Sequence, residues 1–432
     1  MKQLGILVTS FGAALVAVTT AASCDDSAVP AAPAADAATE AEPEDTGAPV
    51  DVPCPASGVS KGPWSLAMTR TGGKVRWEAC RGDSTSGIVL TLEAGGGETA
   101  VPSTSTPAVI TKRRTAPLNP VAAPDDAPGT YYTHEAVLTG LTPGACYRYA
   151  LAADRTLGGR FCASQPDGAK VHFLMIGDTN PQVGPATGNV LGQTLKRTPD
   201  FVMHGGDVQY YDSKVETWNG WFPIMRPMLA QGAFMVSLGN HELELEGEDF
   251  DDYYMRYFGD ASLGGRDAYF HFESGGVHFF ALNSEQPLEP DSVQGKWLAA
   301  GLTDASKTTG YRTSLVFMHR PWVTCGDVSE NIDLRTRWAS TFTQAKVTVV
   351  FQAHMHAYER FDLDGLTWIT TGGGGGLLAN VDENLSRASC ASRKSKGSFF
   401  HAMDVVIDGN KVHADTIDDK GAVRDAFDVT IP

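Results

Sequence analysis

The hydrophobic pattern divides the chain near residue 165 into two parts that differ in the length and spacing of their apolar runs. Over residues 54–165, apolar and polar positions alternate in short runs that are separated by glycine- and proline-rich turns. A period of two is typical of strands with one buried face, and no run here has the period of an amphipathic helix. The pattern therefore predicts a small antiparallel β-sandwich with strands at residues 74–80, 88–93, 133–138, 146–150 and 159–162.

From residue 170 onward, longer apolar runs alternate with helical or irregular segments, which is typical of a layered α/β fold. These runs are rich in β-branched and aromatic side chains, and such runs predict strands that are buried on both faces. We expect residues 163–169 to link the sandwich to an α/β domain over residues 170–432. The predicted strands of this domain are residues 171–177, 201–206, 233–239, 313–318 and 346–353.

The first 24 residues predict an export signal. Lys2 precedes an apolar run over residues 6–22, and small residues then lead into Cys24, a pattern typical of segments that are cleaved during secretion. A membrane anchor is the alternative, but threonine and serine interrupt the run and no basic segment follows it. The ending Ala21-Ala22-Ser23-Cys24 also resembles a bacterial lipobox, although leucine is commoner at the position of Ala21. We predict an exported protein, either a lipoprotein anchored to the cell envelope through Cys24 or a secreted protein.

Residues 25–53 consist mainly of alanine, proline and acidic residues, with eight acidic side chains and no basic one. Such a segment cannot bury enough apolar surface to offset its ordering entropy, so we predict a disordered acidic tether. The whole chain has 34 basic and 51 acidic residues, a net charge of −17. This balance argues against a nucleic-acid-binding surface.

Six cysteines remain once Cys24 is set aside. An even number in an exported chain predicts disulfides, and no CxxC spacing indicates a zinc ribbon. Cys146 and Cys162 lie in neighbouring predicted strands, so we expect them to pair. The simplest remaining pairs are Cys54 with Cys80 and Cys325 with Cys390, although the sequence leaves the connectivity open.

Each of the five predicted α/β strands is followed by carboxylate, amide or imidazole side chains. In a parallel sheet, the carboxyl ends of the strands face the crevice where ligands bind. A single aspartate after a strand is more often a turn residue, and a single histidine is more often part of the core. The same pattern at five strand ends instead predicts a metal site, with more donors than one ion needs. The residues are Asp178, Asp207, Tyr210, Asn240, His241, His319, His354 and His356.

These residues resemble, in order, the motif blocks of the calcineurin-like metallophosphoesterases. The blocks are Asp178, Gly206-Asp207-x-x-Tyr210, Gly239-Asn240-His241-Glu242, Val316-x-x-His319 and His354-x-His356. Tyr210 and the trailing Tyr358-Glu359-Arg360 match the purple acid phosphatase branch. Two departures, Thr179-Asn180 in the first block and Ala353 before the last, remove no ligand but affect the expected loop shape.

The resemblance covers residues 54–432 and implies a fibronectin type III-like sandwich followed by a four-layer α/β/β/α catalytic domain. Residues 141–149 resemble the corner of such a sandwich, with Tyr147 as the corner tyrosine. The resemblance also implies a dinuclear centre of Fe(III) and a divalent ion, which would be Zn, Fe or Mn. Asp207 would bridge the two ions. Asp178, Tyr210 and His356 would hold the first ion, and Asn240, His319 and His354 the second.

The function implied by the resemblance is hydrolysis of phosphate monoesters, with a metal-bound hydroxide as nucleophile and His241 as general acid. A phosphodiesterase or nucleotidase would use the same site. A surface binding protein with an inert phosphoesterase domain is the alternative that is not an enzyme. In each enzymatic case the partners are small phosphorylated substrates.

For other residues near the motifs, the sequence predicts a role less specifically. Arg320 and Trp322 follow His319 directly, so we expect them to line the substrate mouth. His204 either orients a ligand or fills its strand. Residues 372–376 are all glycine but lack the following Lys-Ser/Thr of a P-loop, so we expect a tight turn near the crevice.

Overall fold

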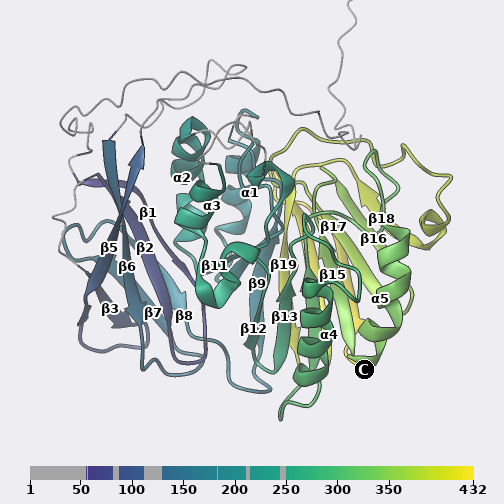
Figure 1. Cartoon of the computed structure of the whole chain (residues 1–432), viewed down its shortest axis with the longest axis horizontal. Helices are drawn as coiled ribbons and strands as arrows, with labels where there is room; N and C mark the ends of the chain where they lie inside the picture. Colours follow the sequence, from purple (N-terminus) through teal and green to yellow (C-terminus); the bar gives the residue numbers. More distant parts are fainter. Residues whose placement is uncertain are drawn as a thin grey trace, which may run out of the picture. The chain divides into compact units, whose positions relative to one another are not determined.

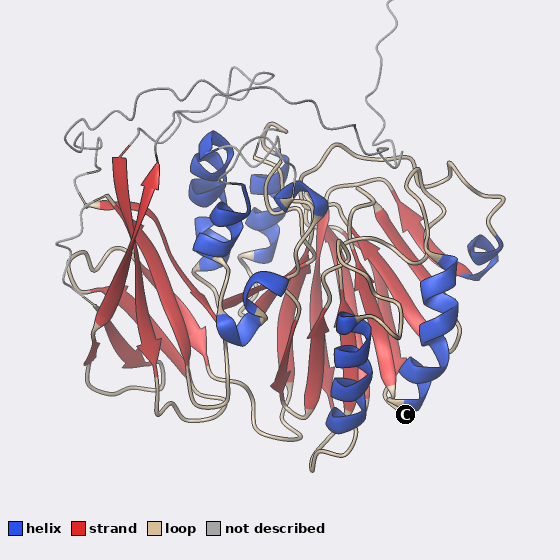
Figure 2. Cartoon of the chain, in the orientation of Figure 1, coloured by secondary structure: helices blue, strands red, loops and turns tan. Residues whose placement is uncertain are grey.

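The computed structural model describes residues 55, 57–80, 87–110, 129–181, 183–210, 215–243 and 250–432. The predicted export signal and tether, with Cys24 and Cys54, lie outside these residues. Within the described part of the chain, no helix has the length and apolar character needed to cross a membrane. Figure 1 shows the course of the chain, and Figure 2 shows a strand-rich amino-terminal part followed by mixed helices and strands.

The amino-terminal part consists of two four-stranded antiparallel sheets. All five strands predicted here are present. Three others were not predicted: β1 contains Gly62 and Pro63, β5 contains Pro107 and is mostly exposed, and β4 is only three residues long. Proline and glycine weaken a strand pattern, which explains the omission of β1 and β5, and β4 is too short to show an alternation. In the first sheet the strand order is β1 (Val59–Leu66), β2 (Gly73–Ala79), β6 (Gly129–Leu138), β5 (Ser103–Ile110). In the second sheet it is β4 (Thr99–Val101), β3 (Ile88–Leu92), β7 (Cys146–Leu151), β8 (Gly158–Cys162).

Two of the expected disulfides are present. Cys146 on β7 pairs with Cys162 on β8, and Cys325 pairs with Cys390. Cys80 is also disulfide-bonded, while Cys54, its expected partner, lies outside the described residues.

The carboxyl-terminal part contains two larger sheets. All five strands predicted here are present, and they are divided between two sheets, in agreement with the two β layers that the family resemblance implied. β9, β10 and β11 lie in a six-stranded sheet, whereas β14 and β15 lie in a seven-stranded one. In the six-stranded sheet the strand order is β11 (Ala233–Val236), β10 (Phe201–His204), β9 (Val171–Ile176), β19 (His401–Asp408), β20 (Lys411–Asp418), β21 (Val423–Thr430). In the seven-stranded sheet it is β12 (Phe270–Ser274), β13 (Val277–Ala281), β14 (Thr313–Phe317), β15 (Val347–Gln352), β17 (Leu366–Thr371), β16 (Tyr358–Leu363), β18 (Arg393–Gly397).

The two larger sheets pack face to face with helices outside them. On β13, Phe279 packs its ring edge-on against Phe173 of β9 at 5.5 Å, whereas the next residue, Phe280, packs with Leu298 and Leu302 of α4. This alternation between neighbouring residues places one face of the sheet against the other sheet and one face against helices. The helices are α1 (Ala186–Thr194), α2 (Val215–Leu229), α3 (Phe250–Tyr257), α4 (Val293–Ala305) and α5 (Ile332–Gln344), with 3-10 turns η1 (Asn240–Glu242), η2 (Ala261–Leu263), η3 (Gly265–Asp267) and η4 (Ala388–Ser392).

The amino-terminal sheets share a hydrophobic core with the carboxyl-terminal part. Trp64 of β1 is fully buried, and its ring lies 5.0 Å from that of Phe222 on α2. Its indole N–H donates to the backbone carbonyl of Tyr257 on α3 at 3.1 Å. These contacts join β1 to α2 and α3.

We predict that Phe279→Ala destabilises the protein by about 3–5 kcal/mol, because it opens a cavity between the two sheets. The measurement is denaturant unfolding with the disulfides intact. Val293→Ala is the control, since Val293 is 80% exposed and should change stability by less than about 0.5 kcal/mol. A loss below about 1 kcal/mol for Phe279→Ala would contradict the sheet-on-sheet core.

Candidate metal centre

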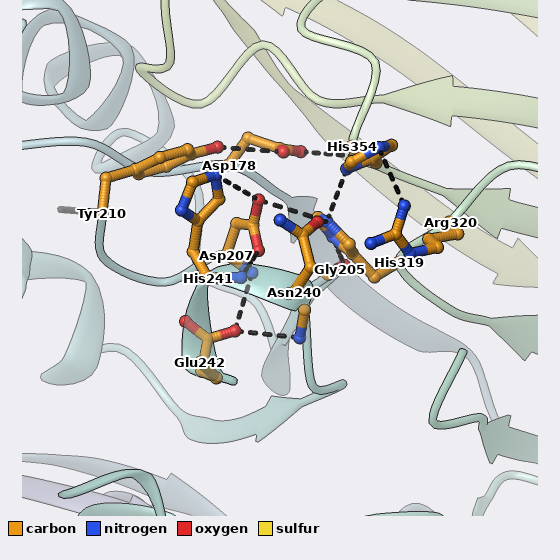
Figure 3. Close-up of polar contacts among 12 residues, drawn as sticks. Asp178, Gly205, Asp207, Tyr210, Asn240, His241, Glu242, His319, Arg320 and His354 are labelled. Atoms are coloured by element: carbon orange, nitrogen blue, oxygen red, sulfur yellow. Dashed lines mark hydrogen bonds and ion pairs between the residues drawn. The ribbon is translucent and has the colours of Figure 1, made fainter. Parts of the chain in front are cut away.

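The side chains predicted as ligands come together where the two larger sheets meet at the carboxyl ends of their parallel strands (Figure 3). The donor atoms of Asp207, His319 and His354 all lie within 4.8 Å of one another. Those of Asp178, Asp207 and His356 form a second group of the same size. Asp207 belongs to both groups, so the arrangement has two lobes with a shared carboxylate.

Three of these residues have left-handed backbone conformations. The φ angles are 58° at Asp178, 51° at Asp207 and 66° at His354. Residues with a side chain rarely adopt this region, and such strain is concentrated at functional sites. Each residue follows a strand, so the positive φ turns the chain abruptly at the point where the side chain enters the centre.

Glycines make room for the ligands. Gly206 has a φ of 92°, and a Cβ there would lie 2.9 Å from Nδ1 of His319. The run 372–376 packs against the centre, as expected of a tight turn: a Cβ at Gly372 would lie 2.7 Å from Oδ2 of Asp178. At Gly376, it would lie 2.7 Å from the ring of His356. The backbone amide of Gly376 donates to the carbonyl of Asp178 at 2.8 Å.

In the first lobe, hydrogen bonds orient the donors toward one another. Nδ1 of His356 lies 2.8 Å from the carbonyl oxygen of Leu377. Because a carbonyl only accepts, Nδ1 carries the proton and the lone pair on Nε2 faces the centre. This Nε2 lies 2.9 Å from the hydroxyl of Tyr210, which donates to Asp178 at 3.0 Å. Burial and the charge of Asp178 raise the pKa of Tyr210 well above its ordinary value.

In the second lobe, the same kind of contact orients His319. Its Nδ1 donates to the carbonyl of Gly205 at 3.0 Å, which leaves Nε2 facing the centre. Nε2 lies 3.0 Å from Oδ1 of Asn240 and 3.1 Å from Nδ1 of His354. Burial alone would lower the pKa of His319, but the neighbouring carboxylate of Asp207 raises it to about 9.

Asp207 lies between the two lobes and is fully buried. Its Oδ1 accepts the backbone N–H of His241 at 2.9 Å, and its Oδ2 lies 3.1 Å from Nε2 of His319 and 3.8 Å from Nε2 of His241. Burial opposes its ionisation, but the charges of His319 and His241 hold its pKa well below the usual range. A buried carboxylate whose Oδ2 faces imidazole nitrogens, with further nitrogen and oxygen donors around it, fits a position between two cations.

Glu242 has a positioning role that the sequence motif alone did not reveal. It is buried, and its carboxylate accepts the backbone amides of Asp207, Val208 and Gly239, each at 2.9 Å. It therefore ties the turn after β10 to the turn after β11. Burial and the nearby charge of Asp207 raise the pKa of Glu242 to about 8.

Thr179, one of the two departures from the family motif, belongs to a second network of this kind. Its hydroxyl donates to the carbonyl of Val208 at 2.8 Å and accepts from the indole of Trp221 at 3.0 Å. Nε2 of His204 lies 3.0 Å from the same hydroxyl, and Nδ1 accepts the amide of Gly206 at 3.2 Å. His204 is thus an orienting residue, and burial lowers its pKa to about 3.

The two residues expected to line the substrate mouth have different locations. Arg320 lies beside the centre, with Nη1 3.5 Å from Nε2 of His354. Trp322 does not: only 1% of it is exposed, and its ring stacks on that of Phe342 in α5 at 6.0 Å. The expectation for Trp322 is therefore corrected, because its large apolar ring packs into the core on the helix side of the seven-stranded sheet.

Comparisons with known proteins agree with this geometry. Residues 171–358 match the profile of the calcineurin-like phosphoesterase family. Purple acid phosphatase 22 of Arabidopsis thaliana is 29% identical over 265 residues, which cover 57% of this chain and 60% of that protein. Purple acid phosphatase 21 of the same plant is 29% identical over 299 residues, covering 65% of this chain and 67% of that protein.

A solved structure, purple acid phosphatase PPD1 from yellow lupin (Lupinus luteus) seeds, shares the fold. It superposes with a TM-score of 0.68 at 18% identity, covering 85% of this chain and 74% of the lupin chain. The match includes the strand-rich amino-terminal part as well as the two larger sheets. Residues 171–358 therefore form a calcineurin-like phosphoesterase domain, in a chain whose homologues include purple acid phosphatases.

Proposed function

We propose that this protein hydrolyses phosphate monoesters at a dinuclear metal centre, in the manner of a purple acid phosphatase. The observation that carries the proposal is the pair of donor groups that share Asp207. Asp178, Tyr210 and His356 would hold one cation, and Asp207 would bridge to the other. The second cation would be held by Asn240, His319 and His354.

The donor types suggest different ions for the two positions. A phenolate from Tyr210 is a hard anionic ligand that suits Fe(III), whereas two imidazoles and a neutral amide suit a divalent ion such as Zn, Fe(II) or Mn. Cations at these positions supply Lewis acidity, which activates water and offsets negative charge on a phosphoryl group.

His241 is the proposed general acid. Its backbone N–H binds Asp207, while its side chain is 17% exposed and its Nε2 lies 3.8 Å from Oδ2 of that carboxylate. Its ring packs 4.3 Å from that of Tyr210. In its protonated form the imidazole can give its proton to the leaving alkoxide oxygen and so avoid release of a strongly basic group.

We also propose that the protein acts outside the cytoplasm, because disulfides such as Cys146–Cys162 and Cys325–Cys390 persist in oxidising compartments. A lipid on Cys24 and the acidic tether would then hold the catalytic part at the cell envelope. The amino-terminal sheets support a fibronectin type III-like sandwich, since the hydroxyl of Tyr147 accepts the backbone N–H of Thr142 at 3.0 Å as a corner tyrosine does.

The first test compares p-nitrophenyl phosphate with its bis-ester at several pH values, alongside metal analysis. We expect faster hydrolysis of the monoester, two metal equivalents per chain, and loss of activity when a strong chelator removes the metal. A preference for the bis-ester would support the phosphodiesterase alternative. Fully loaded protein that hydrolyses neither ester would instead support the inert-domain alternative.

Asp207→Asn should lower turnover by at least about 10³-fold, because a neutral amide cannot bridge two cations as a carboxylate does. Metal content should fall in parallel. Asp304→Asn is the control, since Asp304 lies on the exposed face of α4, with 81% of its side chain accessible. Normal turnover and metal content in Asp207→Asn would refute the bridging role.

His241→Ala should lower kcat by about 10²–10⁴-fold, the usual contribution of a general acid. Metal content should stay near normal, because the side chain of His241 is not among the proposed ligands. The loss should be smaller for substrates whose leaving group is a weak base. His413→Ala, on the exposed part of β20, is the control. Turnover like that of the unmodified protein would make His241 a structural residue.

A further inference from the structure

Arg320 brings a fixed positive charge to the edge of the metal centre. It directly follows His319, and its Nη1 lies 3.5 Å from Nε2 of His354 (Figure 3). The side chain is 36% exposed, so it borders both the ligands and solvent. An arginine in this place can reach a molecule bound at the centre without entering the ligand shell.

Glu285 holds the guanidinium in this orientation. Its two carboxylate oxygens lie 2.8 and 3.0 Å from Nε of Arg320, and its side chain is only 11% exposed. The preceding residue, Ser284, accepts the backbone N–H of Arg320 at 2.9 Å. One short segment therefore fixes both the backbone and the side chain of Arg320.

This segment is itself anchored in the interior. Asn283 is 2% exposed, and its Oδ1 accepts the backbone N–H of Glu285 at 3.0 Å. Gln294 of α4 binds both the amide and the carbonyl of Asn283, each at 2.9 Å. Asn283 also donates to the carbonyl of Asp267 at 2.9 Å. The position of Arg320 is thus preorganised through residues on α4 and η3, which is what a binding group requires.

The charge of Arg320 has no evident benefit for an unliganded centre. A guanidinium repels the cations that the neighbouring ligands would hold, and a partly exposed ion pair such as the one with Glu285 contributes little to stability. An anion that lies between the guanidinium and the cations is attracted by both, so the positive charge of Arg320 then favours binding. Phosphate oxygens suit a guanidinium especially well, because its planar N–H groups match their geometry.

We propose that Arg320 binds a non-bridging phosphate oxygen of the substrate and that Glu285 is its positioning residue. Together they give the centre a preference for dianionic phosphate monoesters over monoanionic diesters. A monoester has one more anionic oxygen for the guanidinium, so it gains more from the added charge. This inference rests on the proposed function and names the feature that selects its substrate class.

The test uses the metal-loaded full chain with Arg320→Gln, Arg320→Lys and Glu285→Gln. Arg320→Gln should raise KM for p-nitrophenyl phosphate about 10–100-fold, as expected when a charged hydrogen bond is lost. Its effect on KM for the bis-ester should be under about threefold, since the diester carries less charge. Arg320→Lys should restore part of the loss, and Glu285→Gln should raise the monoester KM by a smaller factor with kcat nearly unchanged.

The matched control is the exposed ion pair between Arg337 and Asp333 of α5, which is separated by one helical turn and has side chains 52% and 68% exposed. Arg337→Gln and Asp333→Asn should leave both KM values unchanged. Metal content is measured for every variant. Equal losses for both esters, or loss of metal from Arg320→Gln, would overturn the proposal, because either result means a general effect on the centre.

A binding measurement separates this inference from the proposed function. Calorimetric titration of each loaded variant with inorganic phosphate needs no turnover. We expect phosphate to bind more weakly to Arg320→Gln by a factor similar to that for the monoester KM, and Glu285→Gln to fall between that variant and the unmodified protein. Unchanged phosphate affinity would refute the role of Arg320 even in an active enzyme. If Arg320→Gln weakens phosphate binding but the unmodified protein hydrolyses neither ester, the anion-binding role of Arg320 is supported and the proposed hydrolase activity is refuted.

Discussion

The crowding of ionisable donor groups around the buried carboxylate of Asp207 is the constraint on which the rest of this structure depends. Its buried Oδ2 lies 3.1 Å from Nε2 of His319 and 3.8 Å from Nε2 of His241. Lone pairs of neighbouring side chains point at the same small volume. Protons or cations must compensate such an arrangement, and the donor types present suit the two cations proposed above. The surrounding fold acts to keep these atoms together.

Backbone geometry and buried polar residues, which are not themselves among the proposed metal ligands, together keep the donor atoms in place. Left-handed turns at Asp178, Asp207 and His354 bring the side chains inward. Glu242 joins the turns after β10 and β11 through three backbone amides, and Thr179 joins those after β9 and β10. These networks fix the donors before any ion arrives, so less ordering is required on binding.

The rim of the centre has a different physical role from its interior. The interior donors are nearly all buried and determine which cations fit, whereas Arg320 and His241 are partly exposed and can contact a substrate. Both are positioned by hydrogen bonds: the guanidinium of Arg320 donates to Glu285, and the backbone N–H of His241 donates to Asp207. Substrate choice can therefore change at the rim while the metal-binding interior stays the same, as expected of a fold that serves several phosphoesterases.

Local pattern was enough to predict five of the thirteen strands in the two larger sheets and the polar residues at their ends, because buried parallel strands are short apolar runs whose carboxyl ends meet at one edge. It also predicted the pairs Cys146–Cys162 and Cys325–Cys390. It did not reveal which strands belong to which of the two sheets, since both sheets are equally apolar. Nor did it separate exposed Arg320 from buried Trp322, or assign Glu242 and Glu285 their positions. Those outcomes depend on contacts between segments distant in sequence, which only the folded chain brings together.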